Sequence, residues 1–124
     1  MLRLMCKGKI HRATVSEANL DYVGSITIDS LLMKQAGILP YEMVQITSLR
    51  NATRWKTYVL PGPEKSGVIC LNGPPAHLFQ PGDVVIILSQ GLITEEGIAI
   101  LKPRVVFVDP QNQLVRVEEH NLGS

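Results

Sequence analysis

The chain has 124 residues, 45% of them hydrophobic and 19% charged, and its formal net charge is +1. This length suits one domain with a single apolar core, and the composition excludes a disordered chain. The charge is far from the strongly basic balance of nucleic-acid-binding domains, and no apolar run reaches the ~18 to 20 residues of a membrane span. We therefore expect a single domain over residues 1–124, with neither nucleic acid nor membrane as a partner.

The N-terminal segment MLRLMCKGKIH alternates charged residues with short apolar pieces. It lacks the apolar stretch of about 7 to 15 residues that a secretory signal contains, so we expect a cytoplasmic location. Cys6 and Cys70 each lie beside apolar residues, without C-x-x-C or Cys/His spacing. Such cysteines are expected to be buried, reduced thiols.

The predicted elements are mainly short strands, rich in β-branched or aromatic residues and bounded by Gly, Pro or Asn. In chain order they are residues 26–28, 43–49, 55–60, 67–71, 84–90, 104–108 and 113–117. One helix is predicted over 29–36, because Asp29 or Ser30 can cap its start and Gly37 can end it in the left-handed conformation. Weaker helical turns are predicted at 74–78 and 94–98, and residues 118–124 are predicted to form a frayed polar tail.

One internal similarity concerns the segments Pro40-Tyr41-Glu42-Met43-Val44-Gln45-Ile46 and Pro81-Gly82-Asp83-Val84-Val85-Ile86-Ile87, which lie 41 residues apart. Each is predicted to be a turn that leads into a strand. The match is either a coincidence of turn chemistry or the trace of a duplicated β unit. Two similar units that exchange strands would close a small, pseudo-symmetric barrel without exposed edges.

Familiar catalytic motifs are absent: there is no Walker loop, dinucleotide-binding glycine motif, zincin helix or nucleophile elbow. The histidines show no ligand spacing and we expect no metal site; they are His11, His77 and His120. Positive charge is concentrated in two segments without acids, one before Glu17 and one between Glu42 and Glu64. These segments are either solvated strand faces or two groups that converge on a small anion.

The segment Arg54-Trp55-Lys56-Thr57-Tyr58 places polar side chains in a predicted strand. Its period of two puts Arg54, Lys56 and Tyr58 on one face and the other two residues on the opposite face. A guanidinium and a phenol on one face can form a carboxylate clamp with a proton donor. Asn72-Gly73 follows the next predicted strand and offers an amide, although this pair is also a common turn signal.

Four separated motifs belong together: Lys9-Ile10-His11-Arg12, Tyr22-x-Gly24-Ser25, Arg54-x-x-Thr57-Tyr58 and Asn72-Gly73. With matching intervals over residues 1 to about 110, they resemble the aspartate 1-decarboxylase family. Gly24-Ser25 alone would indicate only an ordinary turn. Members of this family convert L-aspartate into β-alanine and CO2 for pantothenate synthesis, and the resemblance implies that this chain is such an enzyme.

The resemblance also implies self-cleavage between Gly24 and Ser25, into a β chain of residues 1–24 and an α chain of residues 25–124. The Ser25 hydroxyl would attack the Gly24 carbonyl, and elimination and hydrolysis of the ester would leave a pyruvoyl group, the cofactor, on residue 25. Glycine suits the attacked position because it has no Cβ and tolerates strain. Donors to the developing oxyanion would give the largest stabilisation, and the family implies Thr57 for this role, with Tyr22 and His11 nearby.

In the mature form, the resemblance implies that the pyruvoyl ketone forms a Schiff base with aspartate and accepts the electrons released with CO2. The implied catalytic residues are Ser25, the source of the pyruvoyl group, and Tyr58, which stays protonated at neutral pH and can reprotonate the α-carbon. The implied substrate-binding residues are Lys9, Arg54, Thr57, Asn72, Gly73 and Ala76. Arg54 would be a bidentate carboxylate clamp, and Lys9 would add a point charge.

The residues after Asn72-Gly73 affect this site. Pro74 and Pro75 have no N–H group, so the amides of Gly73 and Ala76 are the donors expected to face the substrate.

Thr57 raises a separate question, because strand alternation sends it away from Arg54 and Tyr58. A β-bulge, or a site shared by two subunits, would bring the three side chains together. In a regular strand, Thr57 would act through its backbone or from a neighbouring chain.

The fold that the resemblance implies is mainly β, a double-psi β-barrel with one or two short helices. It also implies a homotetramer with its sites at subunit interfaces, and a maturation factor protein as a possible further partner. The alternative is a noncatalytic small barrel that binds an anionic partner through its Lys and Arg segments, with the Gly24-Ser25 bond uncut. Near-neutral charge and an aromatic content of 5% argue against this alternative.

Overall fold

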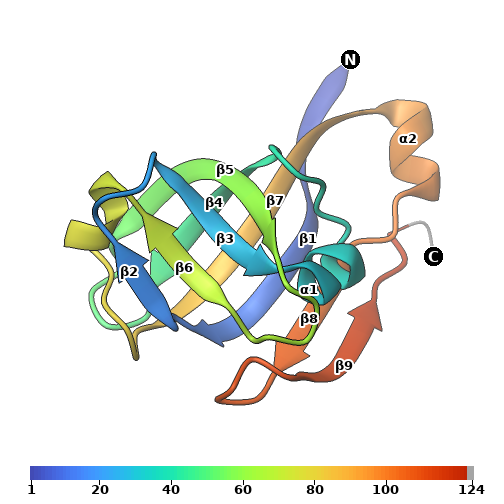
Figure 1. Ribbon diagram of the computed structural model, residues 1–124. Coiled ribbons are helices and arrows are strands. Elements are labelled where there is room, and N and C mark those ends of the chain that lie inside the picture. Colours follow the sequence, from blue (N-terminus) through green and yellow to red (C-terminus); the bar gives the residue numbers. More distant parts are fainter. Residues whose placement is uncertain (123–124) are drawn as a thin grey trace.

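Nine strands within residues 1–122, the part of the chain that this computed structural model describes, form one sheet in the order β2-β6-β3-β5-β4-β7-β1-β8-β9 (Figure 1). The strands are β1 (Leu2–Thr14), β2 (Glu17–Asn19), β3 (Ser25–Asp29), β4 (Met43–Ser48), β5 (Arg54–Gly62), β6 (Ile69–Asn72), β7 (Val84–Thr94), β8 (Arg104–Val108) and β9 (Leu114–Glu119). The helices are α1 (Ser30–Ala36), the 3-10 turn η1 (Pro74–His77) and α2 (Glu95–Ile100). Every predicted strand and helical turn has a counterpart among these elements.

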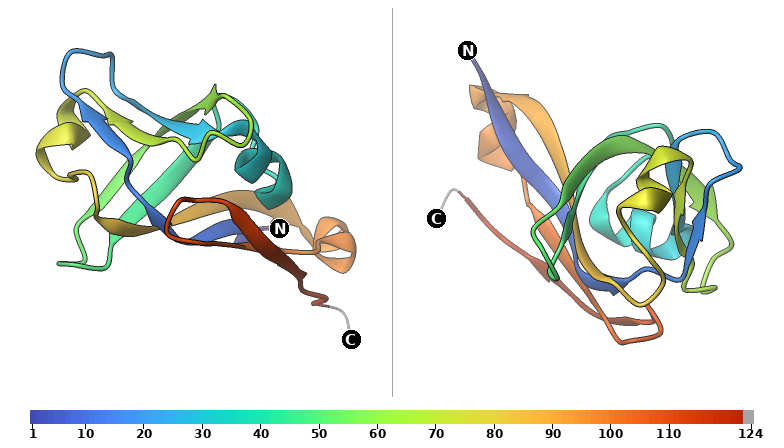
Figure 2. Two further views of the ribbon diagram at one scale, coloured as in Figure 1. Left: turned by 60° about the horizontal axis from the view of Figure 1, so that its bottom comes forward. Right: turned by 90° about the vertical axis from the view of Figure 1, so that its left-hand side faces the viewer.

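The sheet curls into a small barrel around one apolar core, as the end-on view in Figure 2 shows. β1 leads directly into β2, and the link is tied to β6 because the Ser16 amide donates to the Ile69 carbonyl at 2.8 Å. The core consists of alternate strand residues and one side of α1; its fully buried members include Ile10, Ile26, Leu32, Ile46, Val59 and Ile87. The expected mainly β class is confirmed, whereas the double-psi connection remains a prediction.

Helix α1 begins and ends as its capping residues predict. The Asp29 carboxylate accepts a hydrogen bond from the Leu31 amide at 2.9 Å, and Gly37 ends the helix with φ 72°. The same carboxylate accepts from the amides of Lys65 and Gly67, so it also fixes the loop between β5 and β6. No helix within residues 1–122 is long and apolar enough to span a membrane.

Strand β1 is the longest strand and was not predicted. Its sequence lacks a clean period of two because its register against β7 shifts twice, between Cys6 and Gly8 and between Ile10 and Ala13. Its first half pairs with the end of β7 in an arm that projects from the barrel (Figure 1). Cys6 lies on this arm and is exposed, so the expectation of a buried thiol is wrong for Cys6 and confirmed for Cys70.

The predicted polar tail is also partly wrong, because β9 extends to Glu119 and pairs with β8. Residues 123–124 of that predicted tail lie outside the described residues.

The two similar segments at 40–46 and 81–87 have similar structures. Tyr41 and Gly82 occupy equivalent positions, two residues before a strand begins, and both have positive φ, 68° and 94°. The two strands, β4 and β7, are antiparallel neighbours in the sheet. The predicted turn-to-strand geometry is therefore confirmed for both segments, and their origin by duplication remains a prediction.

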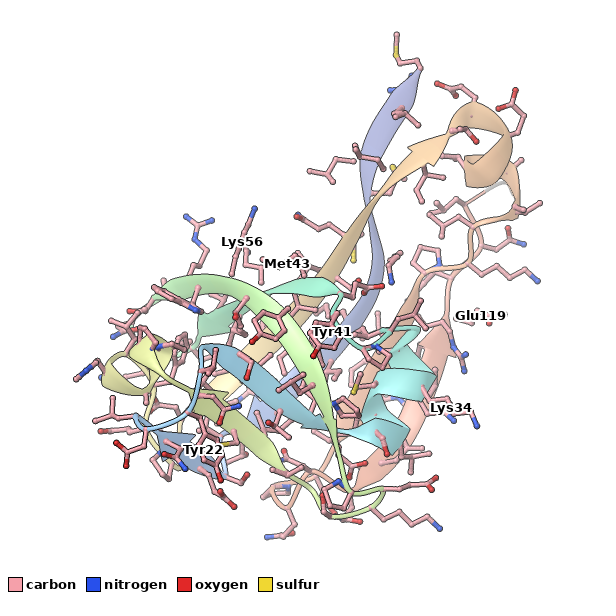
Figure 3. The ribbon with its side chains drawn as sticks, turned by 45° about the horizontal axis from the view of Figure 1, so that its top comes forward. Tyr22, Lys34, Tyr41, Met43, Lys56 and Glu119 are labelled. Carbon is pink, nitrogen blue, oxygen red and sulfur yellow. The ribbon has the colours of Figure 1, made fainter. Side chains whose placement is uncertain are left out.

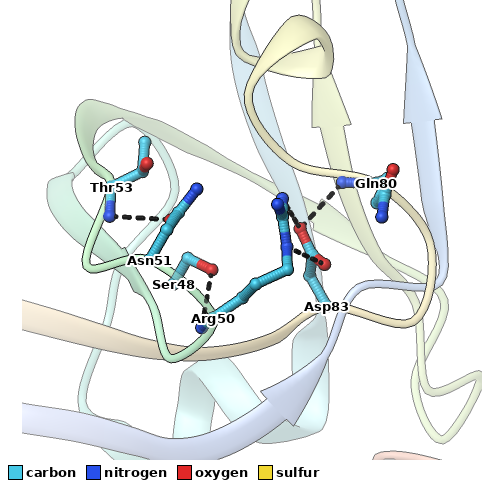
Figure 4. A network of polar contacts seen from close by, with 6 residues as sticks. All are labelled: Ser48, Arg50, Asn51, Thr53, Gln80 and Asp83. Carbon is cyan, nitrogen blue, oxygen red and sulfur yellow. Dashed lines mark hydrogen bonds and ion pairs between the residues drawn. The ribbon is translucent and has the colours of Figure 1, made fainter.

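The turns at the same end of β4 and β7 are joined by an ion pair (Figure 4). Arg50 donates to both Asp83 oxygens, at 3.1 and 3.2 Å, and the Gln80 amide donates to the same carboxylate at 3.1 Å. Asp83 is buried, whereas the Arg50 side chain is half exposed. The hydrogen bonds from Arg50 lower the pKa of the Asp83 carboxyl, and burial opposes them only in part.

The contribution of this carboxylate to stability should depend on pH. Because its pKa is lowered in the folded state, its stabilisation is complete above the unfolded-state pKa of about 4 and is lost as the pH falls through the folded-state value. Asp83→Asn should lower the Tm by about 3 to 6 °C at pH 7, and this difference should narrow below about pH 4. Thermal unfolding across that range tests this, with Asp21→Asn, on an exposed loop, as the control. A Tm difference between Asp83→Asn and wild type that does not change with pH would contradict a stabilising role of the ionised Asp83 carboxylate.

Candidate active site

Ser25 is the first residue of β3 and is completely buried. Its hydroxyl oxygen accepts a hydrogen bond from Asn72 Nδ2 at 2.9 Å, and the hydroxyl donates to the Val23 carbonyl at 3.4 Å. The antiparallel register that pairs Ser25 with Asn72 on β6 produces this contact. In the structure the chain is continuous through Gly24 and Ser25, so the uncleaved form is described.

Asn72 makes two further contacts across the same pair of strands. Its amino group also donates to Thr27 Oγ1 at 3.0 Å, and its Oδ1 accepts from the Cys70 thiol at 3.2 Å. Thr27 and Cys70 are themselves partners in the register of β3 and β6. Ser25, Thr27, Cys70 and Asn72 therefore form a polar quartet on the face of the two strands that points away from the Ile26 and Ile28 core positions.

The loop that carries Gly24 packs closely against Gly73. A Cβ added at Gly73 would lie 2.9 Å from both the Gly24 nitrogen and the Tyr22 carbonyl oxygen, and Gly73 has φ 76°. Only glycine fits this position. Gly24 itself has more room, since a Cβ there would come no closer than 3.7 Å, to Pro74, and it lacks a left-handed φ.

Strand β5 brings Tyr58 and Thr57 to the other side of β3. The parallel register pairs Ile26 with Val59, and one step back along both strands it sets Ser25 level with Tyr58, which Thr57 precedes on β5. β5 is regular against β4 from Arg54 to Tyr58, so the proposed bulge is absent. Thr57 is buried on the core side, and Tyr58 lies on the outer side, where its ring stacks on Tyr41 with centroids 5.4 Å apart.

Lys9 and Arg54 both lie on the outer face of the sheet, but apart from each other. Lys9 pairs with Leu88 of β7, which pairs with Gln45 of β4, which pairs with Lys56 of β5. Three strand spacings, about 14 Å, therefore separate Lys9 from the strand that carries Arg54. Figure 3 shows Lys56 and Met43 on this side of β5 and β4. Within one chain the two cationic segments share a face without converging at Ser25.

His11 and Tyr22 have different surroundings. His11 lies on β1, which is not a neighbour of β3, and its ring meets Phe107 edge to face at 5.5 Å. Burial, together with the nearby charges of Lys9 and Arg12, lowers the pKa of His11. Tyr22 is on the exposed loop before Gly24 (Figure 3), so it is close to the expected cleavage point, and His11 is not brought there within the chain.

The two amides expected to bind substrate are already engaged. The Gly73 N–H donates to the Asn19 carbonyl at 2.8 Å, and the Ala76 N–H donates to the Gly73 carbonyl at 2.9 Å. In this form of the chain neither amide is a free donor. The turn η1 is closed by the Ala76 amide, which donates to Gly73, and by the Pro75 carbonyl, which accepts from the Leu78 and Phe79 amides.

Sequence reasoning missed Thr27 and Cys70 as contacts of Asn72. The available signal was their spacing, since each lies two residues from a predicted site residue and therefore on the same strand face. No group of three His, Cys, Asp or Glu side chains within residues 1–122 is arranged to hold a metal ion.

Comparison with known proteins identifies the family. A family model described as aspartate decarboxylase matches residues 1–115. Proteins named aspartate 1-decarboxylase from Carboxydothermus hydrogenoformans and Moorella thermoacetica are 52% and 50% identical, covering 98% and 96% of this chain and 96% and 93% of their own lengths. One from Lactiplantibacillus plantarum is 54% identical, over 98% of this chain and 96% of its own length.

These matches place the chain among the carboxy-lyases, and the prediction that it is an enzyme is confirmed. The chain belongs to the aspartate decarboxylase family, as its separated sequence motifs predicted.

The close packing at Gly73 should make this position intolerant of any side chain. Gly73→Ala should lower the free energy of unfolding by about 3 kcal/mol, because it adds a backbone clash to the cost of a positive φ. Gly82→Ala is the matched control, since Gly82 has φ 94° but nothing within 4 Å of an added Cβ, and it should lose only about 1 kcal/mol. Urea unfolding measures the free energy of unfolding of both variants. Equal losses would contradict the idea that the close approach of Tyr22 and Gly24 is what excludes a side chain at Gly73.

Proposed function

We propose that this chain decarboxylates L-aspartate to β-alanine and CO2 with a pyruvoyl group that it makes from its own Ser25. The observation that carries the proposal is the buried Ser25 hydroxyl, directly after Gly24 and hydrogen-bonded by Asn72, in a chain of the aspartate decarboxylase family. The product would serve pantothenate synthesis. A cytoplasmic location and the help of a maturation factor remain predictions.

The first step of the proposed maturation is an N to O acyl shift. Ser25 Oγ attacks the Gly24 carbonyl carbon, the bond from that carbon to the Ser25 nitrogen breaks, and the hydroxyl proton ends on that nitrogen. Negative charge develops on the Gly24 oxygen during the attack, and a donor placed there stabilises it. Thr57 is the proposed donor; because β5 is regular and Thr57 is buried on the core side, it would act through its backbone or from a neighbouring chain. Tyr22 and His11 are the other proposed processing residues.

The second step divides the chain. The Ser25 α-carbon loses its proton, the bond from Cβ to Oγ breaks, and Oγ leaves as part of the Gly24 carboxylate. Water then replaces the nitrogen of the unsaturated residue and releases ammonia. The products are residues 1–24 and residues 25–124 with a pyruvoyl group at the new terminus.

The surroundings of Ser25 fit such a group. The site is buried, so water is largely excluded, and the Asn72 amino group is placed to donate to an oxygen at this point. When formed, the pyruvoyl group supplies the electron sink for the pair released as CO2 leaves. Tyr58 lies level with Ser25 on the outer side and is the proposed donor of the proton that the α-carbon then takes up.

The proposed substrate contacts are those of Lys9, Arg54, Thr57, Asn72, Gly73 and Ala76. Arg54 suits a bidentate contact with one carboxylate of aspartate, and Lys9 suits a single charged contact. The separation of Lys9 from the strand that carries Arg54 supports a site completed by a second copy, and hence the proposed homotetramer. The Gly73 and Ala76 amides would have to exchange their present partners to reach the substrate.

Intact mass under denaturing conditions tests the proposal most directly. Wild-type protein should give two fragments split after Gly24, the larger without a free amino group, together with β-alanine formation from aspartate. Ser25→Ala should give one uncut chain without turnover, and Ser66→Ala, on an exposed loop, should behave as wild type. Cleavage that survives Ser25→Ala would exclude the nucleophile. An uncut, inactive wild type would instead indicate a missing maturation factor or, if it stays uncut in a cell extract that supplies such a factor, favour a noncatalytic barrel that binds an anion.

Tyr58→Phe separates turnover from maturation. The variant should still be cleaved, because the phenol is not used in the acyl shift, but its kcat should fall by about 100-fold or more through loss of the proton donor. Tyr41→Phe is the control, since Tyr41 stacks on Tyr58 and loses an equivalent hydroxyl. Equal kcat values for Tyr58→Phe and wild type would remove Tyr58 from the mechanism.

A further inference from the structure

The carboxamide of Asn72 is satisfied by three different side chains of the polar quartet. Its two N–H groups have one acceptor each, Ser25 Oγ and Thr27 Oγ1, and its Oδ1 has one donor, the Cys70 thiol. Asn72 and Cys70 are 1% and 4% exposed and Ser25 is fully buried, so these three side chains are shielded from water, whereas Thr27 is half-buried. The orientation of the amide is therefore decided by the quartet itself.

Only one of the two possible amide orientations satisfies the group. With the carboxamide rotated by 180°, the amino group would replace Oδ1 beside the Cys70 sulfur, which is a weak acceptor and can accept from only one of the two N–H groups. One N–H would then be buried without a partner, which is unfavourable. In the observed orientation the thiol acts as a donor. Burial, with a smaller effect of Glu17, raises the pKa of Cys70 and keeps the thiol protonated at neutral pH.

The orientation matters for the chemistry proposed at Ser25. With the amino group toward Ser25, the hydroxyl oxygen accepts from Asn72 and its proton points to the Val23 carbonyl. A donor at Oγ stabilises the negative charge that this oxygen carries as its proton leaves, and again as it departs with Gly24. In the rotated orientation, Asn72 Oδ1 would accept from the hydroxyl and oppose loss of that proton.

We propose that Thr27 and Cys70 are positioning residues, which hold the Asn72 carboxamide with its amino group toward Ser25 and thereby promote self-cleavage. Neither residue touches the Gly24 carbonyl or the substrate in this account. Thr27 acts as the second acceptor for the amino group, and Cys70 as the donor to Oδ1. The inference rests on the proposed function, because it concerns the rate of the cleavage between Gly24 and Ser25.

The test is the rate of cleavage of the full-length chain, followed by intact mass after rapid purification. Cys70→Ala and Thr27→Val remove the donor and the acceptor, and each should slow cleavage by about 2- to 10-fold. Cys70→Ser replaces the thiol by a hydroxyl donor and Thr27→Ser keeps the hydroxyl acceptor, so both should restore the rate to within about twofold of wild type. Ile69→Val is the matched control, because Ile69 is fully buried on the opposite face of β6. Tm values for all variants separate slow cleavage from poor folding.

Each outcome is informative. Slow cleavage by Cys70→Ala or Thr27→Val, with rescue by the serine variants and a normal rate for Ile69→Val, would support the proposal. A normal rate for both Cys70→Ala and Thr27→Val, or serine variants as slow as these, would overturn it. If Cys70→Ala does not fold, the cleavage rates of Thr27→Val and Thr27→Ser decide. If Thr27→Val does not fold, those of Cys70→Ala and Cys70→Ser decide. Absence of cleavage in wild type, also after addition of cell extract to supply a maturation factor, would instead contradict the proposed function.

Discussion

The position of β3 between β6 and β5 is the constraint on which the rest of the site depends. Its antiparallel register with β6 sets Ser25 opposite Asn72, and its parallel register with β5 sets Ser25 level with Tyr58. A slip of one residue would turn the Ser25 side chain into the apolar core and bring Ile26 to the outer face. The fully buried Ile26 and Ile28 prevent this slip, so core packing and site geometry are fixed by the same five-residue strand.

Elements with local signals could be predicted from the sequence. Asp29 and Gly37 identify the ends of α1 because capping depends on residues close in the chain. The alternation in β5 correctly placed Thr57 opposite Arg54 and Tyr58, and the regular strand excludes the bulge that would have reunited them. β1 could not be recognised in the same way, since its register shifts interrupt the period of two and its projecting half has no buried face.

The site was predictable in part, for a related reason. Separated motifs identified the family and the bond expected to break, but no local pattern could say which strands are neighbours. Thr27 and Cys70 lie 43 positions apart, and only the β3–β6 register brings both to Asn72. The separation of Lys9 from Arg54 likewise follows from the strand order, which places β7 and β4 between β1 and β5.

The location of β1 determines what the proposed cleavage does to the molecule. The bond between Gly24 and Ser25 lies just outside the β3 ladder, whereas residues 2–14 run between β7 and β8 and contribute Ile10 and Ala13 to the core. The 24-residue fragment would therefore stay as an interior strand of the barrel. Maturation would convert one covalent chain into a noncovalent heterodimer whose smaller member cannot dissociate without exposing the core, so the cut adds a chemical group while leaving the architecture in place.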